Sequence, residues 1–286
     1  VTDMQIYLAK TAGFCFGVDR AVSLVEQAIR DGKRAVTLGP IIHNRHVVER
    51  FARLGVREIA SPEEAQPGET VILRAHGEKA MQEELAARGL EVIDATCPFV
   101  EKIHRIVQKA EREGRRCLII GTPEHPEVRA IASFCTGPVV LQSAEELQKW
   151  LDFDGTRRDL PLTMVCQTTE TQKNWDSCRE IAKKICTNLE IFDTICRATE
   201  MRQEEAIRLS RKCDAMVVVG DASSANTGRL AMICKQHCRT VTLVDHAGDL
   251  DLGLFSGAAT IGITAGASTP SWIIKEVNNT MSEELK

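Results

Sequence analysis

Residues 97–125 read CPFVEKIHRIVQKAEREGRRCLIIGTPEH: a cysteine is followed by a helical pattern, an apolar strand and a polar turn. Apolar residues recur at helical spacing from Val100 to Ala110, and the pattern stops at Gly114. The apolar run 118–120 then ends at Gly121, four residues before His125. This order predicts a helix followed by a strand that opens into a polar turn.

The same spacing occurs at two other places in the chain. A glycine lies 24 residues after Cys15, Cys97 and Cys196, and a polar residue lies 28 residues after each of them. The glycines are Gly39, Gly121 and Gly220, and the polar residues are His43, His125 and Ser224. A common offset at three places is hard to obtain by chance, so it predicts three copies of one structural unit.

Strands and helices alternate within each copy, which favours parallel sheets. We therefore predict an α/β fold of three pseudo-symmetric parallel-sheet lobes, arranged in a ring around a central site that the three cysteines approach. The lobes are expected at residues 15–96, 97–195 and 196–286. The third copy ends in a helix with no final strand, so a strand within residues 1–14 is expected to complete it.

The composition excludes several classes of protein. A net charge of -4 without a block of Lys or Arg argues against nucleic acid as a partner. No run approaches the roughly 18 apolar residues of a membrane span, and no targeting pattern is present, so we expect a cytoplasmic protein without a membrane partner. The 11 cysteines are odd in number and dispersed, which favours reduced thiols over a disulfide scaffold.

The three equivalent cysteines, Cys15, Cys97 and Cys196, suit a metal site. Structural zinc usually takes ligands in closely spaced cysteine pairs, which these residues do not form. A 4Fe-4S cluster held by three thiolates keeps one iron open for a substrate. Zinc and an iron-sulfur cluster are both kept as alternatives at this point. The remaining cysteines are expected to be small buried hydrophobic residues: Cys117, Cys135, Cys166, Cys178, Cys186, Cys213, Cys234 and Cys238.

Polar residues follow the predicted strands of all three copies. Parallel sheets bind ligands at the carboxyl ends of their strands, and helix N-termini there favour phosphate. The residues expected at an anion site are His43, His76, His125, Thr168, Ser224, Asn226 and Ser268. The histidines without this registry, His46, His104, His237 and His246, are expected on helices or at the surface.

One carboxylate stands at the same edge. Glu127 follows His125 on a turn between two prolines, where a carboxyl group can relay protons to a substrate. The alternative is a first-turn glutamate that only stabilises a helix N-terminus.

Eight stretches match one family in order along almost the whole chain: residues 13–18 (GFCFGV), 42–44 (IHN), 75–77 (AHG), 94–98 (DATCP), 125–128 (HPEV), 167–169 (QTT), 195–199 (ICRAT) and 264–268 (TAGAS). The chain resembles the 4-hydroxy-3-methylbut-2-enyl diphosphate reductases, which complete the methylerythritol phosphate route of isoprene biosynthesis. It departs from some members at Ser224-Ala225-Asn226, where they have Ser-Ser-Asn. This change removes one hydroxyl near the diphosphate.

The resemblance implies an oxidoreductase with a 4Fe-4S cluster held by Cys15, Cys97 and Cys196, one iron being open for the substrate hydroxyl. Thr168 would bind and orient that hydroxyl, and Glu127 would supply protons. An external electron donor such as ferredoxin or flavodoxin would provide two electrons, and isopentenyl and dimethylallyl diphosphate would be the products. The substrate diphosphate would lie among His43, His76, His125, Ser224, Ala225, Asn226 and Ser268.

Two other functions are weighed against this one. Quinolinate synthase also has three lobes with one cysteine each, but its motifs do not fit this chain. A non-catalytic iron-sulfur sensor or zinc-stabilised phosphate-binding module would leave Glu127 and Thr168 without a role.

Overall fold

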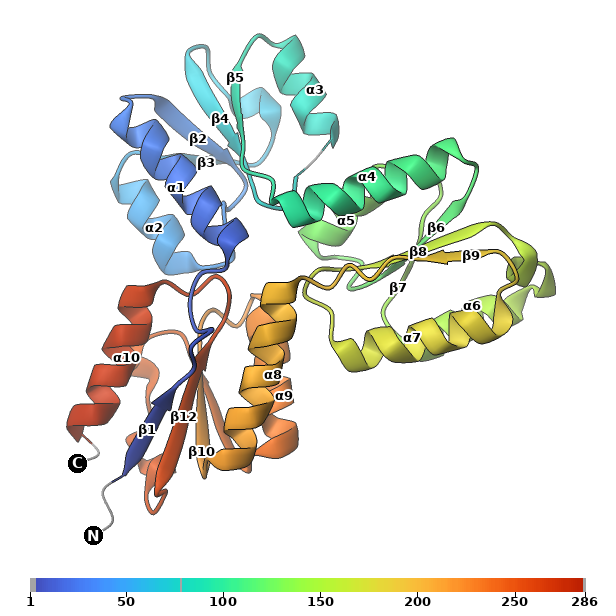
Figure 1. Ribbon diagram of the computed structural model, residues 1–286. Helices are drawn as coiled ribbons and strands as arrows, with labels where there is room; N and C mark the ends of the chain where they lie inside the picture. The colour runs from blue at the N-terminus through green and yellow to red at the C-terminus, as the bar shows by residue number, and fades with distance from the viewer. Residues whose placement is uncertain (1–3, 78, 285–286) are drawn as a thin grey trace. The chain divides into compact units, whose positions relative to one another are not determined.

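The computed structural model describes residues 4–77 and 79–284, and it contains three parallel sheets of four strands each (Figure 1). The first sheet has the order β3 (Arg57–Ile59), β2 (Arg34–Leu38), β4 (Glu69–Leu73), β5 (Glu91–Asp94). The second has the order β7 (Val139–Leu141), β6 (Arg116–Ile120), β8 (Leu162–Cys166), β9 (Leu189–Ile191). The third has the order β11 (Thr240–Val244), β10 (Ala215–Val219), β12 (Thr260–Ala265), β1 (Gln5–Leu8).

The three sheets share one strand order, which confirms the three-lobed α/β fold. The N-terminal strand completes the third sheet as predicted: β1 pairs in parallel with β12, with Gln5 opposite Thr260. Figure 1 shows this dark blue strand beside the red β12. The predicted lobe boundaries themselves stay a prediction, and residues 1–3 and 285–286 of the predicted third lobe lie outside the described residues.

Helices connect the strands. The α-helices are α1 (Phe16–Arg30), α2 (Arg45–Arg53), α3 (Lys79–Ala87), α4 (Pro98–Arg112), α5 (Pro126–Ala132), α6 (Ala144–Phe153), α7 (Gln172–Ile185), α8 (Arg197–Lys212), α9 (Ala225–His237) and α10 (Ser271–Glu284). Short 3-10 helices lie at Pro62–Glu64, Gly155–Asp159, Ala247–Asp249 and Leu252–Phe255. Within the described ranges, no helix has both the length and the apolar character needed to cross a membrane.

The chain divides into two compact units. The first comprises the described residues of Val1–Val22, Ile42–Gly55 and Arg197–Lys286, and it contains the sheet of β1, β10, β11 and β12 with α2 and α8–α10. The second comprises Ser23–Ile41 and Val56–Cys196, and it contains the other two sheets.

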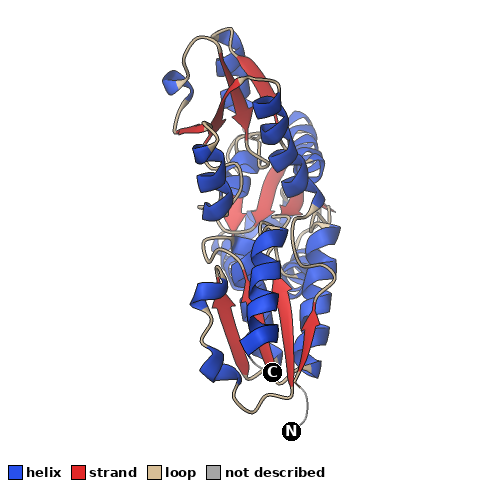
Figure 2. Cartoon of the chain, turned by 90° about the vertical axis from the view of Figure 1, so that its left-hand side faces the viewer, coloured by secondary structure: helices blue, strands red, loops and turns tan. Residues whose placement is uncertain are grey.

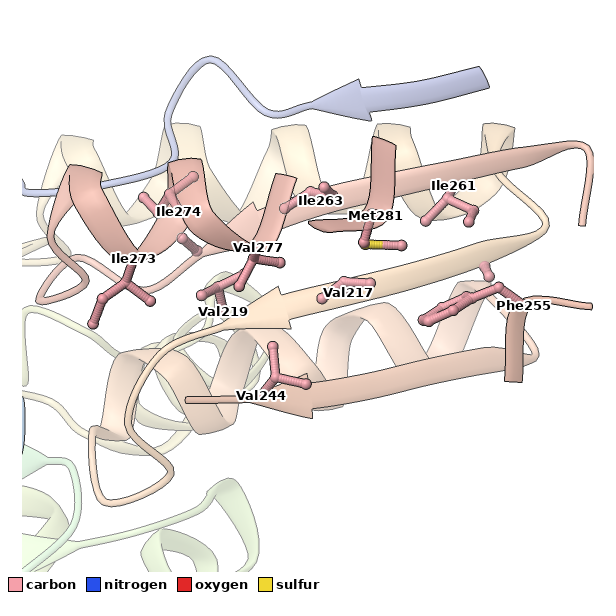
Figure 3. Close-up of a cluster of buried hydrophobic side chains, with 12 residues drawn as sticks. Val217, Val219, Val244, Phe255, Ile261, Ile263, Ile273, Ile274, Val277 and Met281 are labelled. Carbon is pink, nitrogen blue, oxygen red and sulfur yellow. The ribbon is translucent and has the colours of Figure 1, made fainter. Parts of the chain in front are cut away.

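Both faces of the sheet in the first unit are buried. Val217 and Val219 of β10 lie in one cluster with Val277 of α10 (Figure 3). Met216 and Val218 point to the opposite face, where they pack with residues of α8 and α9. Helices accordingly lie in front of and behind these strands (Figure 2). Burial on both faces explains why the strand reads as a continuous apolar run instead of an alternating one.

The glycine shared by the three copies has the same backbone contact each time. The N–H of Gly39, Gly121 and Gly220 donates to the last carbonyl of the neighbouring strand, at Ile59 (2.8 Å), Leu141 (2.9 Å) and Val244 (2.8 Å). At Gly121 an added Cβ would lie 2.9 Å from Gln167 Cβ and 2.9 Å from Val128 Cγ2. The glycine therefore lets the turn after β8 approach α5, which carries Glu127.

Candidate functional site

The three repeated cysteines occupy equivalent positions. Each is partly exposed and directly precedes a long helix, namely α1, α4 or α8. Each backbone N–H also donates to a carbonyl in the turn after the neighbouring strand: Cys15 to Ala267 (3.2 Å), Cys97 to Ala75 (2.9 Å) and Cys196 to Thr168 (2.9 Å). The common offset in the sequence thus corresponds to a common backbone geometry at the carboxyl ends of the strands.

The other cysteines differ from these three. Cys117, Cys166, Cys178, Cys213, Cys234 and Cys238 are buried, as expected, whereas Cys135 and Cys186 are only partly buried. Burial raises the pKa of Cys166 to about 12, and it also raises the pKa of Cys178 to about 12. Neutral thiols in these positions contribute to packing and are poor metal ligands.

In the first unit, the turns after β10 and β12 meet the start of α2. The Ser268 hydroxyl donates to the carbonyl of His43 at 2.9 Å and lies 3.5 Å from Ser224 Oγ. Ser224 is the N-cap of α9, and Asn44 is the N-cap of α2. Helix α9 therefore begins directly after the predicted anion-binding residue Ser224. Helix α2 begins two residues after His43, with the cap Asn44 between them.

Asn226 in the first turn of α9 is buried, and its Nδ2 has no hydrogen-bond partner among the described residues. Leaving a buried amide donor unpaired costs about 1–3 kcal/mol. An anion oxygen at this helix N-terminus would satisfy the donor. Ala225 stands beside it and supplies no side-chain donor of its own.

In the second unit, Glu127 and Thr168 form a buried pair. Glu127 Oε1 accepts the backbone N–H of Thr168 at 2.6 Å, and Glu127 Oε2 accepts the Thr168 hydroxyl at 2.7 Å. The Glu127 side chain is 2% exposed. Glu127 lies in the first turn of α5, as the alternative requires, and its carboxylate is also bonded to the turn after β8.

His125 contacts Glu127 of this pair, and its ring also contacts the ring of His76. His125 caps α5, because its Nδ1 accepts the backbone N–H of Glu127 at 3.1 Å. Its ring meets the His76 ring edge to face, with 5.4 Å between the centroids. The second unit therefore brings together His76, His125, Glu127 and Thr168, while the first brings together His43, Ser224 and Ser268.

Gln167 was not among the predicted site residues. Its fully buried side chain accepts the backbone N–H of Thr122 at 3.2 Å and donates to the Thr169 hydroxyl at 3.0 Å. It links the turn before Glu127 to the turn that carries Thr168. The signal in the sequence was a long polar residue directly after a fully buried strand.

His104 supports the His76 turn from α4. An added Cβ on Gly77 would lie 3.0 Å from His104 Cε1 and 2.8 Å from Thr96 Oγ1, so this turn packs closely on both residues. The expected helical position is confirmed, but the side chain is buried and stacks on Phe134 with ring centroids 4.2 Å apart. Burial lowers the pKa of His104 to about 4, against the opposing effect of Asp94 and Glu101.

This lowered pKa predicts an acid-sensitive fold. Between pH 6.5 and about 4 the unfolded chain binds a proton at His104 that the folded chain does not, so stability falls as the pH falls. The loss should reach about 3 kcal/mol. The free energy of unfolding, measured with denaturant, should depend less on pH over this range in His104→Gln than in the wild type. Parallel profiles for wild type and His104→Gln would contradict the prediction.

The family model described as LytB protein matches residues 6–282. A 4-hydroxy-3-methylbut-2-enyl diphosphate reductase of Citrifermentans bemidjiense is 41% identical over 280 residues, covering 98% of this chain and 97% of the relative. One of Nitratiruptor sp. is 39% identical over 276 residues, covering 96% and 97%.

Two solved structures are also similar. The structure of an (E)-4-hydroxy-3-methyl-but-2-enyl diphosphate reductase, described as the terminal enzyme of the non-mevalonate pathway, has 36% identity and a TM-score of 0.71, and the match covers 98% of this chain and 99% of that one. The E-1-hydroxy-2-methyl-but-2-enyl-4-diphosphate reductase from Plasmodium falciparum has 27% identity and a TM-score of 0.91, with 98% and 88% covered.

Proposed function

We propose which residues of this chain perform the reaction of its family. The chain belongs to the LytB protein family and is an iron-sulfur oxidoreductase, a 4-hydroxy-3-methylbut-2-enyl diphosphate reductase. Cys15, Cys97 and Cys196 hold a 4Fe-4S cluster, and Glu127 with Thr168 handles the protons. The substrate diphosphate is bound by His43, His76, His125, Ser224, Ala225, Asn226 and Ser268.

The chemistry of the donor set supports the cluster. Three thiols share one backbone geometry at strand ends and are partly exposed, while six of the other eight are buried. Thiolates are the usual ligands of iron-sulfur clusters, and three of them leave one iron without a protein ligand. When bound, the cluster supplies electrons and Lewis acidity toward the substrate oxygen.

The buried Glu127–Thr168 pair is the observation that carries the catalytic role. When Glu127 is ionised, the Thr168 hydroxyl donates to its Oε2 and keeps lone pairs for the substrate hydroxyl. When Glu127 is protonated on Oε2, it donates to Thr168 Oγ1, and the Thr168 hydroxyl passes its own hydrogen to the leaving oxygen. A sensor or a phosphate-binding module would have no use for this path.

The overall reaction consumes two electrons and two protons. The carbon–oxygen bond of the substrate hydroxyl breaks and the oxygen leaves as water. A hydrogen added to the carbon that carried the hydroxyl gives dimethylallyl diphosphate, whereas a hydrogen added to the other end of the allylic system, with a shift of the double bond, gives isopentenyl diphosphate. An external carrier such as ferredoxin or flavodoxin provides the electrons. The proposal keeps the cytoplasmic location that we expect from the sequence.

Metal analysis and an anaerobic assay test this function. Protein purified without oxygen should contain about four irons and little zinc. It should consume 4-hydroxy-3-methylbut-2-enyl diphosphate in the presence of a reduced dye. Zinc in place of iron, or iron without turnover, would favour the non-catalytic alternatives and contradict the proposal.

The diphosphate assignment makes a separate prediction. His43→Ala and His125→Ala should each weaken substrate binding by about 1.5–3 kcal/mol, the range of a charge-assisted hydrogen bond. Anaerobic titration of the substrate into each variant measures this, and His237→Ala is the control. An unchanged binding constant in both variants would place the anion elsewhere.

A further inference from the structure

Helix α8 departs from the other two repeated helices in its buried residues. Six residues after the cysteine, Arg202 stands where the other copies have Ala21 and Ile103, and nine residues after it Glu205 stands where they have Leu24 and Ile106. Arg202 is nevertheless 3% exposed and Glu205 is 7% exposed. Replacing buried charged residues by hydrophobic ones often leaves a protein equally stable or more stable. Two buried charged residues at positions that are apolar in the other copies therefore need their own explanation.

Both side chains bind the segment that leads to Cys15. The Arg202 Nη2 donates to the carbonyls of Thr11 and Gly13, at 2.6 Å each. Glu205 Oε1 accepts the backbone N–H of Lys10 at 3.1 Å. Glu205 Oε2 accepts both the backbone N–H and the hydroxyl of Thr11, at 2.8 and 2.7 Å.

The charge on Glu205 is maintained in this position. Burial acts to raise its pKa, but the hydrogen bonds from Thr11 and Lys10, with the charge of Arg208, lower the pKa overall. The carboxylate therefore remains a pure acceptor for three donors of the segment. Arg202 serves the carbonyls of the same segment, so the two residues together bind its donors and acceptors.

This segment is the longest of the three that lead from a strand to a repeated cysteine. Strand β1 ends at Leu8, seven residues before Cys15, whereas β5 ends at Asp94, three before Cys97, and β9 ends at Ile191, five before Cys196. A longer connection loses more conformational entropy when its end is held in one place. Extra backbone hydrogen bonds can offset that loss.

We propose that Arg202 and Glu205 are positioning residues that hold the Lys10–Gly13 segment, so that Cys15 is presented as a ligand of the cluster. This inference rests on the proposed function, because it assigns the two residues a role toward one of its ligands. It explains why α8 has buried charged residues, whereas α1 and α4, the helices after the other two repeated cysteines, do not.

The test compares Arg202→Gln and Glu205→Gln with Arg211→Gln and Glu204→Gln, exposed residues on the same helix. Iron release to a chelator should be faster in the first two variants, with iron affinity lowered about 10- to 100-fold, the range expected when residues that orient metal ligands are replaced. Arg202→Lys should restore part of the retention. Hydrogen exchange of the cluster-free protein should show faster exchange of the Thr11 amide in Glu205→Gln.

The outcomes separate this inference from the function on which it rests. Wild-type release rates in both variants, with normal iron and turnover in the wild type, would overturn the positioning role and leave the function intact. Unchanged Thr11 exchange in Glu205→Gln would also overturn it. Wild-type protein without iron after anaerobic reconstitution would overturn the function and the inference together.

A second variant covers the case in which Arg202→Gln fails to fold. Thr11→Val, which removes only the hydroxyl bond to Glu205, should still accelerate iron release. A wild-type rate of release in this variant would count against the inference.

Discussion

Replacing any one of Cys15, Cys97 and Cys196 by serine is expected to abolish the brown chromophore of the proposed cluster or leave the cluster incomplete, with loss of turnover. A serine hydroxyl is a far weaker ligand for iron than a thiolate, which these clusters require. The three variants should behave alike, because the three positions share one backbone geometry. Iron content and the visible absorption spectrum of anaerobically purified protein measure the effect.

Serine at Cys117 or Cys234 is the matched control. Both thiols are buried in hydrophobic clusters, Cys117 on β6 and Cys234 on α9, so serine should affect packing but leave the iron content unchanged. Equal loss of iron across the two groups of variants would refute the ligand assignment. Retention of a full cluster in Cys97→Ser would refute it as well.

The variant Glu127→Gln should retain a full cluster and near-normal substrate affinity but turn over about 10²- to 10⁴-fold more slowly, as expected when a general acid is removed. Glutamine can still accept the backbone N–H of Thr168 with its oxygen. Its amide end, however, presents a donor to the Thr168 hydroxyl and cannot hold and release a proton at neutral pH. Steady-state rates beside an anaerobic substrate titration separate the two effects.

Glu124→Gln controls for this experiment. Glu124 lies on the same turn, is 79% exposed at its side chain and pairs with Arg129 at 2.9 Å, so its replacement should not change turnover. Comparable losses of affinity and turnover in Glu127→Gln would make Glu127 a binding residue. Full turnover would make it a structural carboxylate.

Much of the fold could be predicted from the sequence because the repeat constrains it. The cysteine and glycine offsets identified equivalent strands, and the missing final strand of the third copy predicted that the N-terminal strand completes that lobe; β1 does so by pairing with β12. The division into two compact units was not predicted. It depends on contacts between distant segments, such as the docking of α2 with the C-terminal sheet, that no local pattern reports.

The site was less visible in the sequence than the fold. Glu127 and Thr168 were selected separately, from their turns, but the hydrogen bonds between them join residues 41 positions apart. In the third repeated helix, the apolar periodicity fails at Arg202 and Glu205. That failure reflected side chains that bind the backbone of another segment.

The pairing of β1 with β12 also sets the order of events during synthesis. Strand β1 is synthesised before the other two sheets, yet its partner β12, with Thr260 opposite Gln5, is synthesised after both of them (Figure 1). The sheets of β2–β5 and β6–β9 can form as they emerge, since domains generally fold in order of synthesis. The backbone N–H of Cys15 bonds to Ala267, which follows β12, so we expect iron to be bound at Cys15 only after β12 has been released.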